Sequence, residues 1–84
     1  MRLDKYLKVS RLIKRRSVAN DACDAGRVSI NGKVAKAGTA VAIGDVIEIK
    51  FGSNTTVAKI TGISENARKD EAGKMYELKA GSEQ

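Results

Sequence analysis

The chain opens with MRLDKYLKVSRLIKRRSVANDACDAGRVSINGKV (residues 1–34), and this stretch decides the fold. It holds two short segments in which apolar residues recur at helical spacing, joined by a connection rich in cations. An alternating segment with an Asn-Gly pair follows them. Two helices followed by strands predict an α+β domain with a small, mostly antiparallel sheet.

The first predicted helix covers residues 2–9. Leu3, Tyr6 and Leu7 recur at the spacing of one helix face, which indicates the buried side of an amphipathic helix. Asp4 lies in the first turn, where a carboxylate interacts favourably with the helix dipole.

A second helix of about nine residues is predicted to begin at Ser17 as its N-cap and to end at Gly26, which accepts a left-handed conformation. The apolar positions expected on its buried side are Val18, Ala19, Ala22, Cys23 and Ala25. Between the helices, Leu12 and Ile13 are expected to turn inward, which leaves the cations of the connection in water.

A strand and a hairpin follow Gly26. Val28 and Ile30 alternate with polar residues, the pattern of a half-buried strand. Asn31-Gly32 is the strongest turn signal in the chain, because both residues accept the positive φ of a type I′ turn.

The rest of the sheet is predicted from turn and strand composition. Gly44-Asp45 marks a turn before the strand 46–51. A last pair of strands is expected at 56–63 and 75–78. Residues 64–74 between them fit either a loop or a short helical turn. One domain is therefore expected over residues 1–80, with a core motif at 1–51 and a frayed tail at 81–84.

Charge is divided unevenly along the chain. The first 36 residues carry ten Lys and Arg against three Asp, whereas the remainder carries six Lys and Arg against seven Asp and Glu. All of the formal net charge of +6 therefore comes from the first half. Such segregation favours a polyanionic partner over a merely soluble basic surface, since affinity for phosphates rises with the cations presented together.

Composition excludes several kinds of site. The chain has one cysteine, Cys23, and no histidine, so an internal disulfide and a Cys/His zinc site are excluded, and Cys23 is expected in the core. Only three aromatic residues are present, too few for a platform that stacks several bases. No signal peptide or membrane span is predicted, so we expect a cytoplasmic protein that does not contact membranes. No cofactor and no metal are expected, and the expected state is a monomer.

These motifs resemble the RNA-binding domain named after small-subunit ribosomal protein four. The matching elements, in chain order, are Arg2-Leu3-Asp4-Lys5-Tyr6-Leu7, Ser10-Arg11, Arg16-Ser17, Ala19, Gly26-Arg27-Val28, Ile30-Asn31-Gly32 and Gly44-Asp45. In that family, two helices and the following hairpin form an L-shaped unit whose basic inner face binds structured RNA. The fold implied by the resemblance agrees with the fold predicted from residue spacing.

The first sixteen residues resemble most closely one group of stand-alone bacterial members, the RqcP group. Members of this group act on dissociated large ribosomal subunits that carry a stalled nascent chain. The related heat-shock protein fifteen group shares the front end but continues into a long basic extension, whereas this sequence has a neutral C-terminal part. The resemblance implies P-site tRNA and large-subunit rRNA as ligands, the large ribosomal subunit as the place of action, and support of alanine tailing with the partner factor RqcH.

The residues expected to contact RNA are Arg2, Asp4, Lys8, Arg11, Lys14, Arg15, Arg16, Arg27, Lys33 and Lys36. Arginine is favoured because its planar fork binds phosphate through two hydrogen bonds. Two interpretations of Asp4 stay open: it seats an RNA-contacting arginine or a nucleotide, or it serves the helix dipole and pairs with Lys8 one turn later.

Three other functions compete with this prediction. A general rRNA-binding factor in ribosome assembly or recycling would share the same surface. An RNA-modifying enzyme is disfavoured, because no catalytic domain follows the sheet and the carboxylate pairs Asp21/Asp24 and Asp70/Glu71 lack a third ligand. A DNA-binding helix-turn-helix would present Asn20, Asp21 and Asp24 to phosphates, which is unfavourable for the two aspartates.

Overall fold

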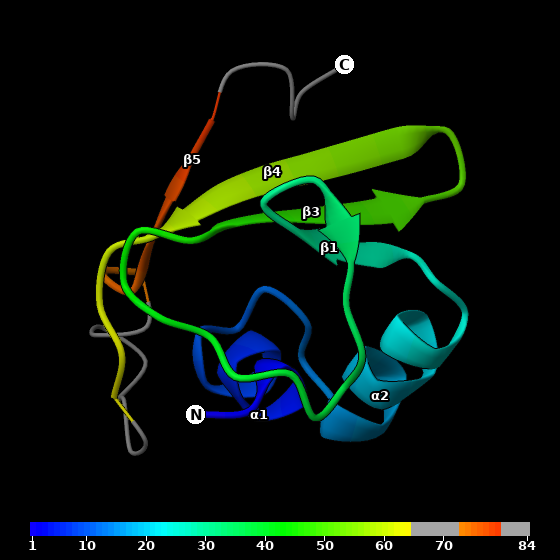
Figure 1. Cartoon of the computed structure of the whole chain (residues 1–84), viewed down its shortest axis with the longest axis horizontal. Helices are drawn as coiled ribbons and strands as arrows, with labels where there is room; N and C mark the ends of the chain where they lie inside the picture. The colour runs from blue at the N-terminus through cyan, green and yellow to red at the C-terminus, as the bar shows by residue number, and fades with distance from the viewer. Residues whose placement is uncertain (65–72, 80–84) are drawn as a thin grey trace.

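Two helices come first along the chain and five strands follow, as Figure 1 shows for this computed structural model, which describes residues 1–64 and 73–79. The helices are α1 (Leu3–Val9) and α2 (Arg16–Asp24), and the strands are β1 (Val28–Ile30), β2 (Lys33–Val34), β3 (Val46–Phe51), β4 (Asn54–Ile60) and β5 (Tyr76–Leu78). The predicted α+β fold class is confirmed.

The five strands form one sheet in the order β2-β1-β3-β4-β5, and every neighbouring pair is antiparallel. The register pairs Val28 with Ile49 and Ile47 with Ala58, so these apolar side chains share one face of the sheet. Both helices pack against this face (Figure 1). The molecule is therefore two layers, helices on sheet, around one core.

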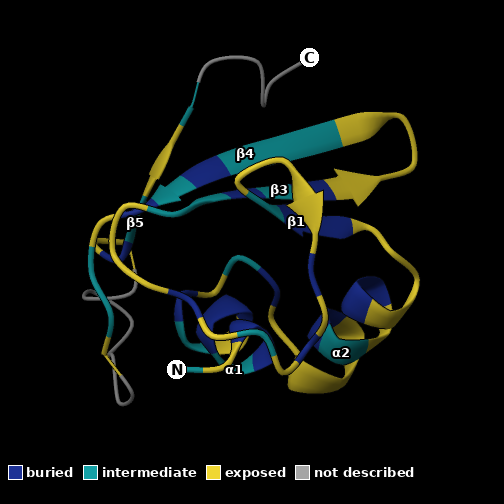
Figure 2. Ribbon diagram, in the orientation of Figure 1, coloured by how far each residue is buried: buried dark blue, intermediate teal, exposed yellow. Residues whose placement is uncertain are grey.

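The core is built from the residues that carry the helical and strand periodicities. Leu3, Tyr6 and Leu7 of α1 are fully buried and contact a layer that includes Ile47 and Ile49 of β3. Figure 2 shows the buried residues concentrated between the helices and the sheet. Burial of this apolar surface is the main stabilising contribution to the fold.

The second helix begins before its predicted start. Arg15 is the N-cap residue and α2 starts at Arg16, so the prediction of Ser17 as the cap is wrong. Ser17 lies within the first turn, and no side chain caps the helix. Ala19, Ala22 and Cys23 are buried as predicted. Val18 and Ala25 are exposed, so the buried side of the second helix is narrower than the predicted one.

The strand predictions hold with shifts at the ends. β3 has its predicted bounds, whereas β4 begins at Asn54 and ends at Ile60 instead of covering 56–63. The earlier start follows from the tight β3–β4 turn, in which Gly52 has φ +58° and Phe51 pairs with Asn54. β5 covers Tyr76–Leu78. Most of the segment 64–74 and the predicted tail 81–84 lie outside the described residues.

The Asn31-Gly32 turn is confirmed, with φ of +52° and +86° as a type I′ turn requires. The side chain of Asn31 also forms two hydrogen bonds. Its side-chain oxygen accepts a hydrogen bond from the Val46 amide (3.0 Å), and its side-chain nitrogen donates to Asp45 Oδ1 (3.1 Å). The hairpin is thereby joined to the turn that starts β3.

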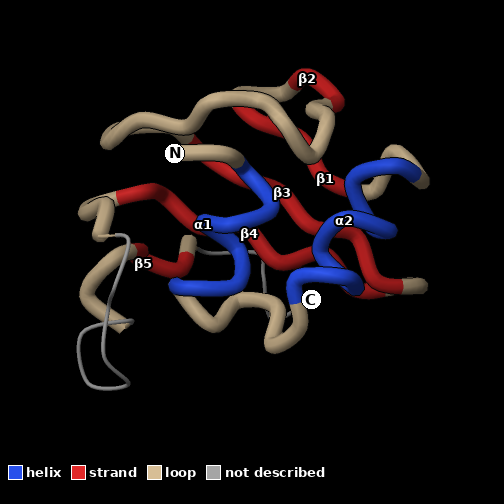
Figure 3. Tube along the Cα trace, turned by 90° about the horizontal axis from the view of Figure 1, so that it is seen from below, coloured by secondary structure: helices blue, strands red, loops and turns tan. Residues whose placement is uncertain are grey.

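The loop after the hairpin, residues 35–41, runs beside the start of α1 (Figure 3). The amide of Leu3 donates to the Thr39 carbonyl (2.8 Å) and that of Asp4 to the Ala37 carbonyl (3.1 Å). A loop far along the chain thus satisfies amides that a helix start leaves unpaired. Within residues 1–64 and 73–79, no helix has the length and apolar character needed to cross a membrane.

Candidate RNA-binding surface

The carboxylate of Asp4 joins the two helices through two arginines. Arg2 donates from Nε to Oδ1 (3.2 Å) and from Nη2 to Oδ2 (3.3 Å). Arg16 approaches from α2, with Nη2 at 3.4 Å from Oδ1 and Nε at 3.4 Å from Oδ2. Asp4 therefore seats both arginines, and among the described residues its ion-pair partners are these and not Lys8.

Asp4 stays ionised in this setting. Burial raises the pKa of its carboxyl, but the hydrogen bonds from Arg16, the Lys5 amide (2.8 Å) and Arg2 act in the opposite direction, and the net result is a pKa below the ordinary 3.8. A buried charge of this kind is tolerated because each oxygen receives several donors. The carboxylate is therefore a fixed anchor at neutral pH.

The two arginines keep much of their donor capacity. The Asp4 side chain is 3% exposed, whereas those of Arg2 and Arg16 are 56% and 49% exposed. A guanidinium has five N–H donors, so each arginine retains donors beyond those used on Asp4. Two oriented guanidinium groups side by side are suited to binding phosphate oxygens.

Asn20 also contacts Asp4, although the sequence predicted that this residue lies on the exposed side of the second helix. Its Nδ2 donates to Asp4 Oδ2 (3.4 Å), and the residue is half-buried. The available signal was spacing, because Asn20 follows Arg16 by one helical turn and both must face the same neighbour. We call Arg2, Asp4, Arg16 and Asn20 the Asp4 cluster.

The connection between the helices carries the remaining cations of the predicted elbow. Arg11, Lys14 and Arg15 are all exposed, while Ile13 is buried beneath them and donates its amide to the Leu7 carbonyl (3.0 Å). Arg11 has φ +63°, a left-handed conformation that a side chain adopts at some cost. The structure therefore presents these cations on a short, fixed turn next to the start of α2.

The other predicted contact residues lie at three places. Lys8 is exposed in the last turn of α1, and Lys36 is exposed in the loop that runs beside Arg2. Lys33 belongs to the edge strand β2. Arg27 is separated from the Asp4 cluster, because it lines a pocket on the other flank of α2.

Metal-binding residues are not assembled in the described part of the chain. No group of three or more His, Cys, Asp or Glu residues that could hold a metal ion occurs there. Cys23 is buried in the core as predicted, and burial, with the nearby charges of Asp4 and Asp24, raises the pKa of its thiol to about 11. The thiol is therefore protonated and poorly nucleophilic at neutral pH. Asp70 and Glu71 lie outside the described residues.

Comparisons with known proteins point to one family. The family model of the S4 domain matches residues 1–47. The RQC P-site tRNA stabilizing factor of Halalkalibacterium halodurans is 54% identical over 79 residues, which cover 94% of this chain and 90% of that protein. The chain belongs to the family of S4-domain proteins that includes this factor. The factor of the same name from Bacillus subtilis is 46% identical, with 93% of this chain and 91% of that protein covered.

A solved structure supports the same placement of this S4-domain chain. A trimeric structure of heat shock protein 15 from Vibrio cholerae superposes with a TM-score of 0.88 at 36% identity, covering 98% of this chain and 84% of that one. The heat shock protein 15 homolog of Aeromonas salmonicida is 35% identical, and the match covers 52% of its length. The resemblance to the S4 domain and to the RqcP group is thereby confirmed.

Proposed function

We propose that this chain binds P-site tRNA and large-subunit rRNA on dissociated large ribosomal subunits that carry a stalled nascent chain. The observation that carries the proposal is the Asp4 cluster, in which two half-exposed arginines from the two helices are fixed on one buried carboxylate. The printed names of the relatives, P-site tRNA stabilizing factors, support tRNA as one ligand. The cations of the elbow, with Lys8 and Lys36, extend this surface.

The chain acts in this proposal by holding RNA and not by chemistry. Fixed guanidinium groups give affinity without loss of side-chain freedom at the moment of binding. A bound factor of this kind would keep the tRNA in place while another protein extends the nascent chain. We propose that it supports alanine tailing in this way, together with the tailing factor RqcH, and that it acts in the cytoplasm as a monomer.

Sedimentation with purified large ribosomal subunits tests the binding site. Arg2→Ala and Arg16→Ala should each weaken co-sedimentation about tenfold or more, because a hydrogen-bonded charge contact contributes about 1.5–3 kcal/mol. Lys74→Ala is the matched control, since it removes one exposed positive charge that is not among the residues contacting Asp4. If both arginine variants follow large subunits as fully as the wild type does, the site assignment is wrong.

Further measurements separate the rival functions. Alanine addition to a stalled nascent chain, reconstituted with RqcH, should fall when Arg16→Ala replaces the wild type. Loss of binding with unchanged tailing would contradict the tailing part of the proposal. Competition by duplex DNA as effective as that by large subunits would favour a DNA-binding protein, and turnover of an RNA substrate by the purified chain would favour an enzyme.

A further inference from the structure

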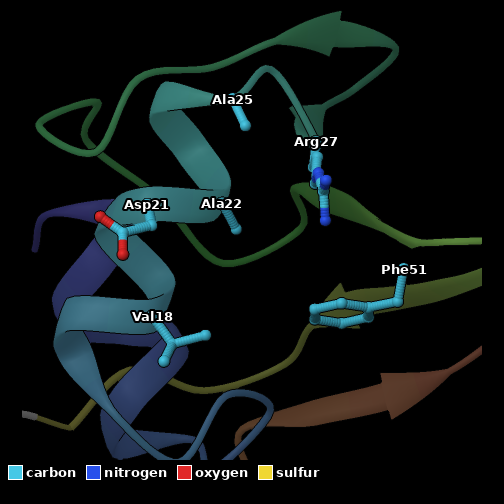
Figure 4. Close-up of a pocket in the computed structure, with 6 residues that line it drawn as sticks. All are labelled: Val18, Asp21, Ala22, Ala25, Arg27 and Phe51. Carbon is cyan, nitrogen blue, oxygen red and sulfur yellow. The ribbon is translucent and has the colours of Figure 1, made fainter.

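An open pocket lies on the flank of α2 that faces away from the Asp4 cluster. Its volume is about 270 Å³, and its lining residues are Val18, Asp21, Ala22, Ala25, Arg27 and Phe51. Figure 4 shows Val18 on the side of the helix that faces Phe51, with Arg27 near the ring, whereas the carboxylate of Asp21 projects away from them. The pocket is slightly below the range of about 300–1,000 Å³ for small-molecule sites, so it suits one planar ring and not a longer ligand.

Phe51 is an aromatic ring on the core face of the sheet that the core does not cover. It follows Ile47 and Ile49 on the same face of β3, and both of those are buried. Phe51 is 39% exposed, and Val18 opposite is 43% exposed. One of only three aromatic side chains in the protein therefore presents its ring to solvent inside a pocket.

The guanidinium of Arg27 is available to a ligand. Among the described residues, Arg27 forms no ion pair. Arg27 is fixed at the backbone, because its carbonyl accepts the amide of Lys50 (2.9 Å) at the end of β3. The pocket thus offers a ring and a guanidinium beside an apolar floor of Ala22 and Ala25.

We propose that this pocket binds one unpaired nucleotide. The base stacks on Phe51, and its phosphate meets Arg27. Asp21 and Asp24 along the exposed side of α2 disfavour a run of phosphates there, so one nucleotide enters and not a strand. The proposal rests on the proposed RNA-binding function and adds a second contact, made by base stacking, on the other flank of α2.

A tryptophan reporter tests the pocket directly. The chain contains no tryptophan, so Phe51→Trp introduces a single fluorophore that keeps an aromatic ring at the site. Unpaired hexamers of cytidine and of uridine, and a fully paired RNA duplex, are the probes. We expect both hexamers to quench the fluorescence, since every base has a face that can stack on the ring. The paired duplex should leave the fluorescence unchanged.

Three variants control the experiment. Ile43→Trp places a tryptophan at another exposed site, before the opposite end of β3, and should not be quenched. Arg27→Ala should weaken binding of both hexamers, because the phosphate loses its charged partner. Phe51→Leu keeps apolar volume but removes the ring, and should weaken binding of the cytidine hexamer about fivefold or more, as loss of one stacked base does.

The outcomes separate this proposal from the proposed function. If Phe51→Trp still follows large subunits but no hexamer quenches it, the pocket proposal is overturned and the proposed function stands. A fluorescence change that requires added RqcH and no RNA would instead assign the pocket to a protein partner. Failure of the wild type to follow large subunits would overturn the proposed function, whatever the hexamers do.

Discussion

At the scale of single residues, Asp4 decides how the basic surface works. A count of charges predicts that removing a carboxylate near phosphates strengthens RNA binding. Its contacts with Arg2 and Arg16 predict the opposite, because both guanidinium groups lose their anchor. We expect Asp4→Asn to weaken binding to large subunits about tenfold. Asp24→Asn, which removes one exposed carboxylate, should leave binding unchanged or slightly tighter, and equal behaviour of the two variants would contradict the seating role.

The same carboxylate predicts a pH dependence of stability. Its pKa in the folded state is below the ordinary 3.8, so its contribution to the free energy of unfolding is fully present above that value and is lost as the pH falls through the folded pKa. Denaturant unfolding should therefore show Asp4→Asn less stable than the wild type by about 1–2 kcal/mol near neutral pH. The difference should close as the pH falls below 3.8 and through the folded pKa, whereas a constant difference would indicate a purely packing effect.

A substitution at Arg11 should change RNA binding without lowering the stability of the fold. Its φ of +63° is a conformation that glycine adopts without cost and other residues do not. We expect Arg11→Gly to leave the free energy of unfolding unchanged or to raise it by up to about 1 kcal/mol, while weakening binding to large subunits. Lys14→Gly removes one charge from the same connection but relieves no left-handed backbone conformation, so it should lower the free energy of unfolding. If Arg11→Gly destabilises the chain more than Lys14→Gly, the strain argument is wrong.

At the scale of elements, Tyr6 joins α1 to the chain that leads into β5. Its buried hydroxyl donates to the Met75 carbonyl at 2.6 Å, across 69 residues of sequence. Tyr6→Phe removes this bond, but the Met75 carbonyl still accepts amides from Thr61 and Gly62. We therefore expect a loss of about 1 kcal/mol in thermal or denaturant unfolding. Tyr76→Phe, whose hydroxyl has no bond within the described residues, should cost less, and equal losses would contradict this role.

The elements themselves could be predicted because local patterns determine them. Buried residues of α1 and the Asn31-Gly32 turn follow from spacing and from tolerance of positive φ. The start of α2 could not be predicted in the same way, since Ser17 is a good cap in isolation but Arg16 is held by Asp4 from another helix. Tertiary contacts of this kind override local preference.

The candidate site could be predicted only in part, because local patterns indicate single residues but not the contacts between the two helices. The motif indicated Arg2 and Arg16, and the sequence left two roles open for Asp4. Its contacts show hydrogen bonds with both arginines, as the first of those roles requires, while its place in the first turn of α1 still suits the helix dipole. Asn20 was not predicted as a neighbour of Asp4. Its spacing from Arg16 places both residues on one face of α2, but spacing alone does not show that this face meets Asp4. Arg27 was predicted with the other cations, yet one turn of chain after α2 moves it to a different flank.

At the scale of the whole molecule, α2 divides two surfaces of different character. One flank carries Arg16 and Asn20 toward Asp4, and the other carries Val18 and Ala25 toward Phe51. Under the two proposals, phosphate contacts on the first flank would depend on salt, whereas stacking on the second would depend on the ring. A single helix would then contribute phosphate contacts on one side and base stacking on the other.

The segregation of charge into the first half of the chain predicts a steep dependence of binding on salt. If the five exposed arginines and lysines at positions 2, 11, 14, 15 and 16 each contact one phosphate of single-stranded character, the logarithm of the binding constant should fall with the logarithm of salt concentration at a slope near about −3.5. Arg16→Ala should reduce the slope by about 0.7, because one counterion contact is lost. Lys74→Ala, which removes a charge elsewhere, should leave the slope unchanged. Association with large subunits that is insensitive to salt would contradict the phosphate-binding surface, and a slope reduced equally by both variants would mean that net charge and not the Asp4 cluster determines affinity.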